Sequence, residues 1–274
     1  MDSARRWCFD RDAEAYARWR PGYPDRLYAI LERICGLGPG SAVLEIGPGT
    51  GQATRELLAR GARLVTVELG GNMAQRLRAE FPDLTVINAD FTTASLPDAS
   101  FDLAVCATSM HWLDAATAVP KIARALRPGG WLAAWWTVFG DPSRPSTPFR
   151  ERLLPMLDER LPGPPESHLV PRALRTDARV AELTSGGWFT HVETDQLPWS
   201  PRFTPAELTG LFATFPNIAE HPSRDDLLAD IEALATEHAR DGKVTEHYLI
   251  ALYLAQRPHP DSPPPTPARP GYPG

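Results

Sequence analysis

The sequence predicts an α/β fold in which helices cover both faces of a mostly parallel β-sheet. Three observations support this prediction. Short apolar runs alternate with longer segments of helical periodicity through the first half of the chain. The first run, residues 41–46, leads directly into a glycine-rich loop. The second run, residues 63–68, ends in an acid about 20 residues beyond the first glycine, a spacing typical of nucleotide-cofactor sites.

The chain begins with a predicted helical pair. Residues 9–35 have helical periodicity, which is interrupted at Pro21-Gly22 and then resumes at Leu27. One interpretation is that the pair only covers an edge of the sheet. The other is that the polar side chains near the interruption, Tyr16, Arg20 and Tyr23, close over a ligand.

The first predicted strand and its loop form the most informative segment. Val43, Leu44 and Ile46 are apolar, as expected of a strand that is buried on both faces, and Glu45 lies among them. Three glycines follow at alternate positions, Gly47, Gly49 and Gly51, and then a predicted helix that runs to residue 60. Glycines allow the backbone to approach a ligand closely, and the start of the helix presents free N–H groups.

The glycine spacing distinguishes between cofactors. The dinucleotide fingerprint is Gly-x-Gly-x-x-Gly, but Gln52 stands at its third glycine, which disfavours a nicotinamide oxidoreductase. The stretch from Glu45 to Gly51 instead resembles motif I of the class I S-adenosylmethionine-dependent methyltransferases, although Pro48 removes one backbone donor. The resemblance implies a Rossmann-like, seven-stranded, mostly parallel sheet. It also implies S-adenosylmethionine as cofactor and S-adenosylhomocysteine as product.

The second strand and the helix after it are expected at the adenosine. The carboxylate of Glu68, at the end of the strand, can accept hydrogen bonds from both ribose hydroxyls. The alternative is an ordinary surface acid at a strand end. Asn72 and Met73 open the next predicted helix, whose first turn would lie beside the adenosine.

The third strand, predicted at residues 84–88, is followed directly by Asp90 and Phe91. In the class I family an acid at this point accepts a hydrogen bond from the adenine amino group, and the next residue packs on the ring. The resemblance therefore assigns both residues to the cofactor site. The alternative for Asp90 is a loop acid or a helix N-cap.

The fourth strand, residues 103–107, ends at the carboxyl edge of the sheet, where ligands of α/β proteins bind. Ala107 and Thr108 are expected to border the cofactor, and His111 and Trp112 to lie near the transferred methyl group. His111 is a candidate general base because its ordinary pKa is close to neutral. Alternatively, His111 and Trp112 only shape the pocket by packing.

A helix is predicted from Asp114 to Arg127, and a fifth strand over residues 131–138. Trp135 and Trp136 should point to opposite faces, because neighbouring residues alternate along a strand. Trp135 is a candidate for the substrate pocket, and the alternative is that both rings pack in the core.

Prolines break up residues 140–176, which we interpret as an insertion over the active site. A helix over residues 177–188, a strand over 189–197, helices within about 204–240 and a final strand over 244–255 complete the predicted domain. The Tyr-x-x-x-Arg-Pro-x-Tyr-Pro string of residues 16–24, the His111-Trp112 pair and this layout resemble the trans-aconitate-methyltransferase-like group. The resemblance implies that Arg20 pairs with the carboxylate of the cofactor. We also expect Tyr16 at the methionine end of the cofactor and Tyr23 in the substrate pocket beside it.

The resemblance covers about residues 9–257, and we expect a single methyltransferase domain over residues 1–257, with a helical lid over about residues 1–38. Eight prolines fall within residues 258–274, which predicts a disordered tail.

Composition limits the possible partners. The chain has 274 residues, 43% of them hydrophobic, and a net charge of −6, which argues against a nucleic acid or an anionic membrane as the main partner. We find no apolar run long enough to span a bilayer, no secretory signal and no zinc-type cysteine spacing, so we expect a cytoplasmic protein without a metal.

The predicted function is methyl transfer to a small molecule, such as a carboxylic acid or a secondary metabolite. Two alternatives remain open. One is an enzyme that uses the same cofactor for aminocarboxypropyl transfer or cyclisation and releases 5′-methylthioadenosine. The other is a non-catalytic module that binds the cofactor.

Overall fold

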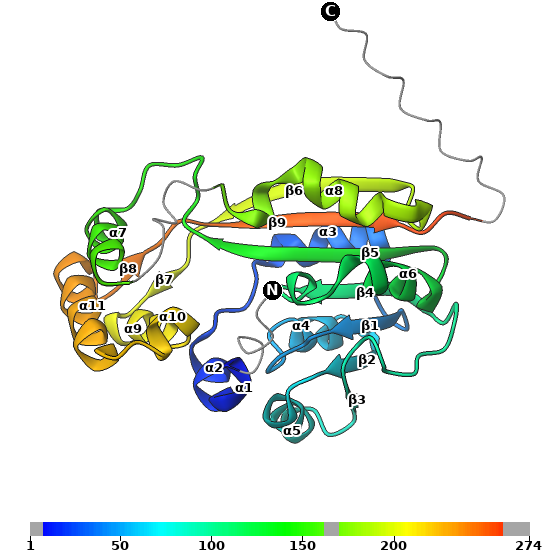
Figure 1. Ribbon diagram of the computed structural model, residues 1–274, viewed down its shortest axis with the longest axis horizontal. Coiled ribbons are helices and arrows are strands. Elements are labelled where there is room, and N and C mark those ends of the chain that lie inside the picture. The colour runs from blue at the N-terminus through cyan, green and yellow to red at the C-terminus, as the bar shows by residue number, and fades with distance from the viewer. Residues whose placement is uncertain (1–7, 162–169, 260–274) are drawn as a thin grey trace, which may run out of the picture.

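A seven-stranded sheet forms the centre of the protein (Figure 1). The computed structural model describes residues 8–161 and 170–259, so almost all of the predicted proline-rich tail lies outside the described residues. The strand order is β3-β2-β1-β4-β5-β9-β6. The first five strands are parallel, and β9 is antiparallel to both of its neighbours. The predicted seven-stranded, mostly parallel sheet is therefore confirmed.

The strands of the main sheet occur close to their predicted positions, because each apolar run is long enough for one buried strand. They are β1 (Ala42–Ile46), β2 (Arg63–Glu68), β3 (Thr85–Asn88), β4 (Phe101–Ala107), β5 (Leu126–Phe139), β6 (His191–Trp199) and β9 (Tyr248–Gln256). A separate two-stranded sheet is formed by β7 (Arg202–Phe203) and β8 (Val244–Thr245).

Helices cover both faces of the sheet. One hydrophobic cluster joins α3 (Asp25–Cys35) and α4 (Thr54–Ala59) to Val43, Leu103 and Trp135. The other joins α6 (Ala115–Ala125) and α8 (Thr176–Thr184) to the opposite side chains of the same strands, such as Trp136. Helix α5 (Gly71–Glu80) packs against β2 and β3.

Two predicted boundaries differ from the structure. β5 begins at Leu126 and not at residue 131, because Leu126 pairs with Phe101 before the ladder resumes at Trp131. The predicted final strand is divided into β8 and β9 at Glu246 and His247, where the Glu246 side chain turns into the protein toward Arg150. The apolar pattern alone did not reveal this break, because residues on both sides of it are buried.

The remaining helices form a cap and a lid beside the sheet. The cap consists of α7 (Pro148–Arg160), α9 (Pro205–Ala213), α10 (Pro216–Ala219) and α11 (Arg224–His238) and has its own hydrophobic cluster. The lid consists of α1 (Cys8–Arg11) and α2 (Ala13–Trp19), which lie between the cap and α5 (Figure 1). At the contact between α2 and α9, a Cβ added to Gly210 would lie 2.3 Å from the Trp19 ring. Lid and cap therefore pack tightly against each other.

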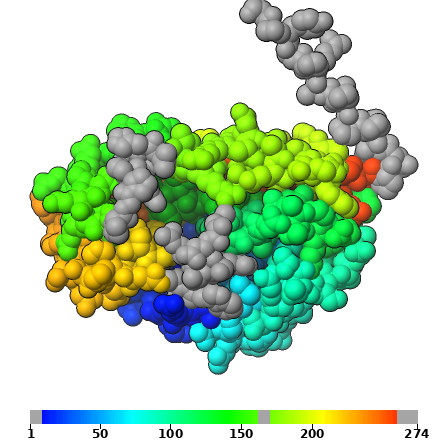
Figure 2. Space-filling view, in the orientation of Figure 1, coloured from blue at the N-terminus to red at the C-terminus, as the bar shows by residue number. Residues whose placement is uncertain are grey.

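In Figure 2, the lid lies between the cap and the part of the molecule that contains α5 and β3. Within the described residues, no helix is long and apolar enough to cross a membrane.

Candidate active site

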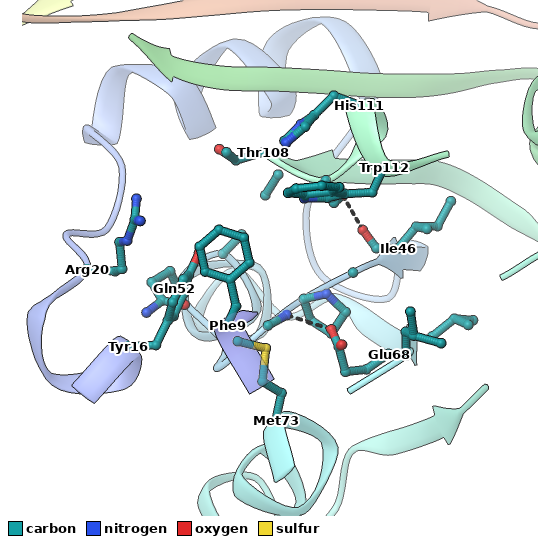
Figure 3. Close-up of a pocket in the computed structure, with 18 of the residues that line it drawn as sticks. Phe9, Tyr16, Arg20, Ile46, Gln52, Glu68, Met73, Thr108, His111 and Trp112 are labelled. Carbon is teal, nitrogen blue, oxygen red and sulfur yellow. Dashed lines mark hydrogen bonds between the residues drawn. The ribbon is translucent and has the colours of Figure 1, made fainter. Parts of the chain in front are cut away.

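A pocket lies at the carboxyl ends of β1, β2, β4 and β5, beneath the lid (Figure 3). Glu68 and Met73 line one end, and Arg20, His111 and Phe139 line the other. The location agrees with the general rule for parallel sheets, in which loops at the carboxyl ends of the strands form the ligand site. Sequence segments more than 100 residues apart thus contribute to one cavity.

The glycine loop forms the floor of the pocket. Gly47, Gly49 and Gly51 all have positive φ angles, of 66°, 60° and 95°, in the region that favours glycine. A Cβ added to Gly47 would lie 2.8 Å from the Cβ of Ser109, so the loop also requires a small residue for packing. Gly47 and Gly49 line the pocket, whereas Gly51 faces the Phe81 and Leu77 side chains behind the loop.

Glu68 is buried at the same end of the pocket as Met73 and connects two backbone segments. One carboxylate oxygen accepts a hydrogen bond from the Gly49 N–H at 2.9 Å, and the other accepts one from the Gly70 N–H at 2.7 Å. Burial raises the pKa of Glu68, and these two hydrogen bonds oppose the rise. Because a carboxylate has about four acceptor positions, Glu68 retains acceptor capacity for a ligand beside its backbone hydrogen bonds.

The other residues expected at the adenosine end divide into two groups. Met73 and the buried ring of Phe91 line the pocket. Asn72 and Asp90 are not among the lining residues. The side chain of Asn72 donates to the Asp10 carbonyl of the lid, and Asp90 Oδ1 accepts hydrogen bonds from the backbone N–H and the hydroxyl of Thr92.

Glu45 lies under the floor of the pocket rather than in its lining. Its side chain is fully buried, and Oε2 accepts a hydrogen bond of 2.6 Å from the Thr54 hydroxyl at the start of α4. No described residue bonds to Oε1. Burial raises the pKa of Glu45 to about 8, so the side chain is mostly protonated at neutral pH. Among the described residues, Glu68 is therefore the acidic side chain that lines this pocket.

We expect the stability of the variant Glu45→Gln to depend less on pH than that of the wild type, because the wild type loses stability when Glu45 ionises. The pKa of Glu45 is raised from 4.5 to about 8 on folding, so its contribution is fully present below pH 4.5 and is lost as the pH rises through 8. The neutral glutamine has the shape of the protonated acid and does not titrate. Denaturant unfolding of both proteins at about pH 6 and about pH 9 should show a difference in stability that shifts in favour of the variant at the higher pH. If the free energies of unfolding of the two proteins differ by the same amount at both pH values, the pKa of Glu45 lies near its ordinary value.

The end of β4 has an unusual backbone conformation. Thr108 has a φ of +56°, which is rare for a β-branched residue and is often found at functional sites. Its N–H donates to the Trp135 carbonyl at 2.8 Å, and its hydroxyl shares a hydrogen bond of 3.3 Å with the Tyr23 hydroxyl. Ala107, Thr108 and Tyr23 all line the pocket, as predicted.

Trp135 does not line the pocket. Its fully buried ring packs against Tyr23, with 5.4 Å between ring centroids, in the core beneath α3. Thr137 and Phe139, on the same face of β5 but closer to its end, line the pocket instead. The alternation of side chains along β5 thus predicted the correct face of the strand. Which residue on that face lines the pocket depends on how far the pocket extends along β5.

His111 and Trp112 lie on a short 3₁₀ helix, Met110–Trp112, that follows β4. Both rings line the pocket, with 4.5 Å between their centroids, and Figure 3 shows His111 above Trp112. The Nδ1 atom of His111 accepts a hydrogen bond of 2.9 Å from the Trp136 indole N–H. Burial is the main cause that lowers the pKa of His111 to about 4, and Arg172 adds to it.

The lid and the residue that follows it, Arg20, form another wall of the pocket. Tyr16 and Arg20 line it as predicted, together with Phe9, whose ring lies 5.7 Å from that of Tyr16. One Arg20 nitrogen donates to the Thr214 carbonyl of the cap. Within the described part of the chain, Arg20 forms no ion pair, and its Nε has no hydrogen-bond partner. The guanidinium is instead surrounded by aromatic rings, with that of Phe215 at 4.4 Å.

Three lining residues had no clear signal in the sequence. Phe9 and Phe139 look like ordinary core residues, and Gln52 drew notice only because it replaces a glycine. Phe9 reaches the pocket because the lid folds back over the sheet, and Phe139 because β5 extends past the end of β4. The dense aromatic content of residues 7–23 was the one available hint.

The pocket fits an adenosyl cofactor. Glu68 offers remaining acceptor capacity to a ligand hydroxyl, and Val67, Leu69 and Phe91 offer apolar contacts beside it. The glycine loop allows close approach by the ligand. Within the described residues, no group of three or more histidine, cysteine or acidic side chains is placed to hold a metal ion.

Known proteins agree with this interpretation. Residues 44–134 match a family described as a methyltransferase domain. An uncharacterised methyltransferase of Mycobacterium tuberculosis is 33% identical over 203 residues, which are 73% of this chain and 73% of the relative.

Two solved structures share the fold. A protein described as a type II methyltransferase from Anaeromyxobacter dehalogenans aligns with a TM-score of 0.63 and 23% identity, over 88% of this chain and 99% of its own. Phosphoethanolamine N-methyltransferase 2 of Haemonchus contortus, in complex with S-adenosyl-L-methionine, aligns with a TM-score of 0.55 and 20% identity, over 94% of this chain and 61% of its own. The chain belongs to the class I S-adenosylmethionine-dependent methyltransferases.

Proposed function

We propose that this methyltransferase acts on a small molecule that occupies the same pocket as its cofactor. The observation that carries the proposal is the continuity of the pocket, which extends from Glu68 to Phe139 beneath the lid and beside the cap. A pocket covered in this way favours an acceptor that enters as a whole over a segment of a large polymer. The net charge of −6 also disfavours a nucleic acid.

We assign the cofactor to the half of the pocket that contains Glu68. In this assignment Glu68 accepts hydrogen bonds from the ribose, Met73 and Phe91 contact the adenine, and the backbone of Gly47 and Gly49 borders the sugar. Tyr16, Arg20, Ala107 and Thr108 hold the methionine end, as expected from the sequence. S-adenosylmethionine supplies a methyl group on a positively charged sulfur.

The other half of the pocket is then available for the acceptor. His111, Trp112, Thr137, Phe139 and Tyr23 line it, so most of the surface is apolar with a few polar groups, as is usual for small-molecule sites. The role of these residues is to orient the acceptor and exclude water. Orientation alone can supply roughly 7–11 kcal/mol of a barrier in favourable systems.

We also propose that lid and cap belong to one methyltransferase domain over residues 1–257 rather than to separate domains. The support is that both contribute to the same pocket, through Arg20 and Phe139, and that Trp19 of the lid packs against Gly210 of the cap.

The proposal is tested by incubating the protein and S-adenosylmethionine with a panel of small molecules that includes carboxylic acids, phenols and amines. Mass spectrometry should find S-adenosylhomocysteine together with an acceptor heavier by one methyl group. Release of 5′-methylthioadenosine would instead indicate aminocarboxypropyl transfer or cyclisation. The proposal would be contradicted if the protein binds the cofactor and methylates RNA or protein but methylates none of the small molecules on this panel.

A further inference from the structure

The hydrogen bond between Trp136 and His111 determines which nitrogen of the histidine carries a proton. The indole N–H of Trp136 is a donor only, and it points at His111 Nδ1 at 2.9 Å. Nδ1 must therefore be the acceptor nitrogen. A neutral imidazole has one donor and one acceptor nitrogen, so the proton of His111 is on Nε2.

The surroundings hold this arrangement in place. The Trp136 ring packs edge-on against Tyr253, with 5.8 Å between centroids, and the Tyr253 hydroxyl donates to the Ala173 carbonyl at 2.6 Å. His111 itself is packed against Trp112 on its other side. Burial and the nearby Arg172 lower the pKa of His111 to about 4, which keeps the ring neutral at physiological pH.

The Nε2–H group of His111 remains available to a ligand. Within the described residues, Nε2 has no hydrogen-bond partner, and His111 lines the acceptor half of the pocket. To act as a general base, Nε2 would have to be unprotonated, which would place a proton on Nδ1 against the Trp136 N–H. The ring is therefore arranged to donate a hydrogen bond and not to accept a proton.

The pocket offers no obvious substitute for a base. The usual bases are histidine and carboxylate side chains, and among the described lining residues these are His111 and Glu68 alone. Glu68 lies at the opposite end, where both of its oxygens accept backbone hydrogen bonds. Burial raises the pKa of the Tyr23 phenol, so this side chain is protonated at neutral pH.

We propose that His111 is a fixed hydrogen-bond donor to the acceptor, oriented by Trp136, and that the acceptor is a small molecule whose reacting oxygen is already ionised when it binds. This inference rests on the proposed function. The guanidinium of Arg20 is assigned to the methionine end of the cofactor, so the ionised acceptor is inferred from the lack of a base among the described lining residues and not from the charge of Arg20.

The chemistry balances without a protein base. The ionised oxygen of the acceptor provides the electron pair of the new oxygen–carbon bond to the methyl group. The electron pair of the broken carbon–sulfur bond remains on sulfur, which loses its positive charge. No proton is transferred, so the task of His111 is to hold the oxygen in position.

The first test is the protonation of the His111 ring, measured by ¹⁵N NMR on the full-length protein without an acceptor. The signals are assigned by their loss in the variant His111→Gln. We expect a neutral ring with its proton on Nε2 that does not titrate between about pH 8 and about pH 5.5. In Trp136→Phe, which lacks the indole N–H, the ring should also populate the form protonated on Nδ1. A wild-type ring protonated on Nδ1, or one that titrates near 6.5, would overturn the donor assignment.

The second test compares two substitutions of His111 in the release of S-adenosylhomocysteine. Glutamine retains an N–H donor but is not a base, whereas phenylalanine retains only the ring. With a carboxylic acid acceptor, we expect His111→Gln to stay within about tenfold of the wild-type rate and His111→Phe to lose about 10- to 150-fold in kcat/KM, the effect of one hydrogen bond to a charged group. Binding of S-adenosylhomocysteine, measured by calorimetry, should be unchanged in both variants.

Two results of this comparison would overturn the proposal. One is an equal loss of activity in both variants. The other is turnover of a phenol whose pKa is well above the assay pH, if that turnover requires His111. The two tests also separate this inference from the proposed function. If the ring is neutral and protonated on Nε2 but no small molecule is methylated, the proposed function and the ionised acceptor fail while the donor assignment stands.

Discussion

Replacing Glu68 by glutamine is expected to weaken binding of S-adenosylhomocysteine by about 10- to 150-fold. The glutamine side chain has one acceptor oxygen, so its amide N–H₂ must face either the Gly49 N–H or the Gly70 N–H, which the carboxylate now binds at 2.9 and 2.7 Å. One buried donor thus loses its partner, and one ribose hydroxyl loses a charged acceptor. The lost hydrogen bond to the ribose costs about 1.5–3 kcal/mol of binding free energy, and about 1.4 kcal/mol is a factor of ten in affinity. The unpaired backbone donor is present with and without the ligand, so it lowers the stability of the fold instead.

Isothermal titration calorimetry measures this effect directly. Glu193→Gln, at an exposed acid on β6 far along the sheet, is a matched control and should bind the product as the wild type does. Unfolding of Glu68→Gln by denaturant separates a loss of affinity from a loss of folding. An affinity within about twofold of the wild type would remove Glu68 from the ribose site.

The sequence was sufficient to predict the sheet and the position of the glycine loop. The five parallel strands each contain a recognisable apolar run, and polar residues directly after such a run must lie at one edge of the sheet. That rule placed Gly47, Glu68 and Thr108 together although they are far apart in sequence, and the structure places all three in the lining of one pocket.

Local patterns were less informative about which side chains face the ligand. Asp90 and Asn72 follow their strands as the pattern requires, but their side chains bond to Thr92 and to the lid. Glu45 has the position of a motif acid, yet it is buried under the loop against Thr54. For Asn72 and Glu45 the orientation depends on a partner from another segment, which no local rule specifies, whereas Asp90 bonds to Thr92 in its own loop.

The role of His111 shows the same limit. The sequence placed this histidine in the crevice and left open whether it is a base or a packing residue. The decisive partner is Trp136, 25 positions away on the opposite face of β5 from Trp135. The strand pattern predicted which way the Trp136 side chain points, but the donor geometry required the structure.

The break between β8 and β9 leads to the second large prediction. Glu246 is fully buried where these strands separate, and it forms an ion pair with Arg150, which is itself only 8% exposed. Glu246 also accepts a hydrogen bond of 2.7 Å from the Thr147 hydroxyl. Arg150 in turn donates to the Phe139 carbonyl at 3.0 Å, at the end of β5. The ion pair thus connects the cap to a strand that lines the pocket.

We expect Glu246→Gln to lower the free energy of unfolding by about 3–5 kcal/mol, because it leaves the guanidinium of Arg150 buried without a countercharge. Denaturant unfolding measures this loss. The exposed pair between Arg160 and Asp230 provides the control, and Asp230→Asn should cost less than about 1 kcal/mol. A loss for Glu246→Gln as small as that of the control would mean that the buried pair contributes little.

A double variant distinguishes the unpaired charge from simple loss of packing. If the cost of Glu246→Gln comes from the stranded guanidinium, then adding Arg150→Met removes that charge, and the double variant should be more stable than Glu246→Gln alone. If the cost comes from lost packing, the two changes should add. Because Arg150 also holds the Phe139 carbonyl, the double variant should impair the acceptor half of the pocket even where stability is regained. Binding of S-adenosylhomocysteine, at the Glu68 end, should then change less than the KM for the acceptor.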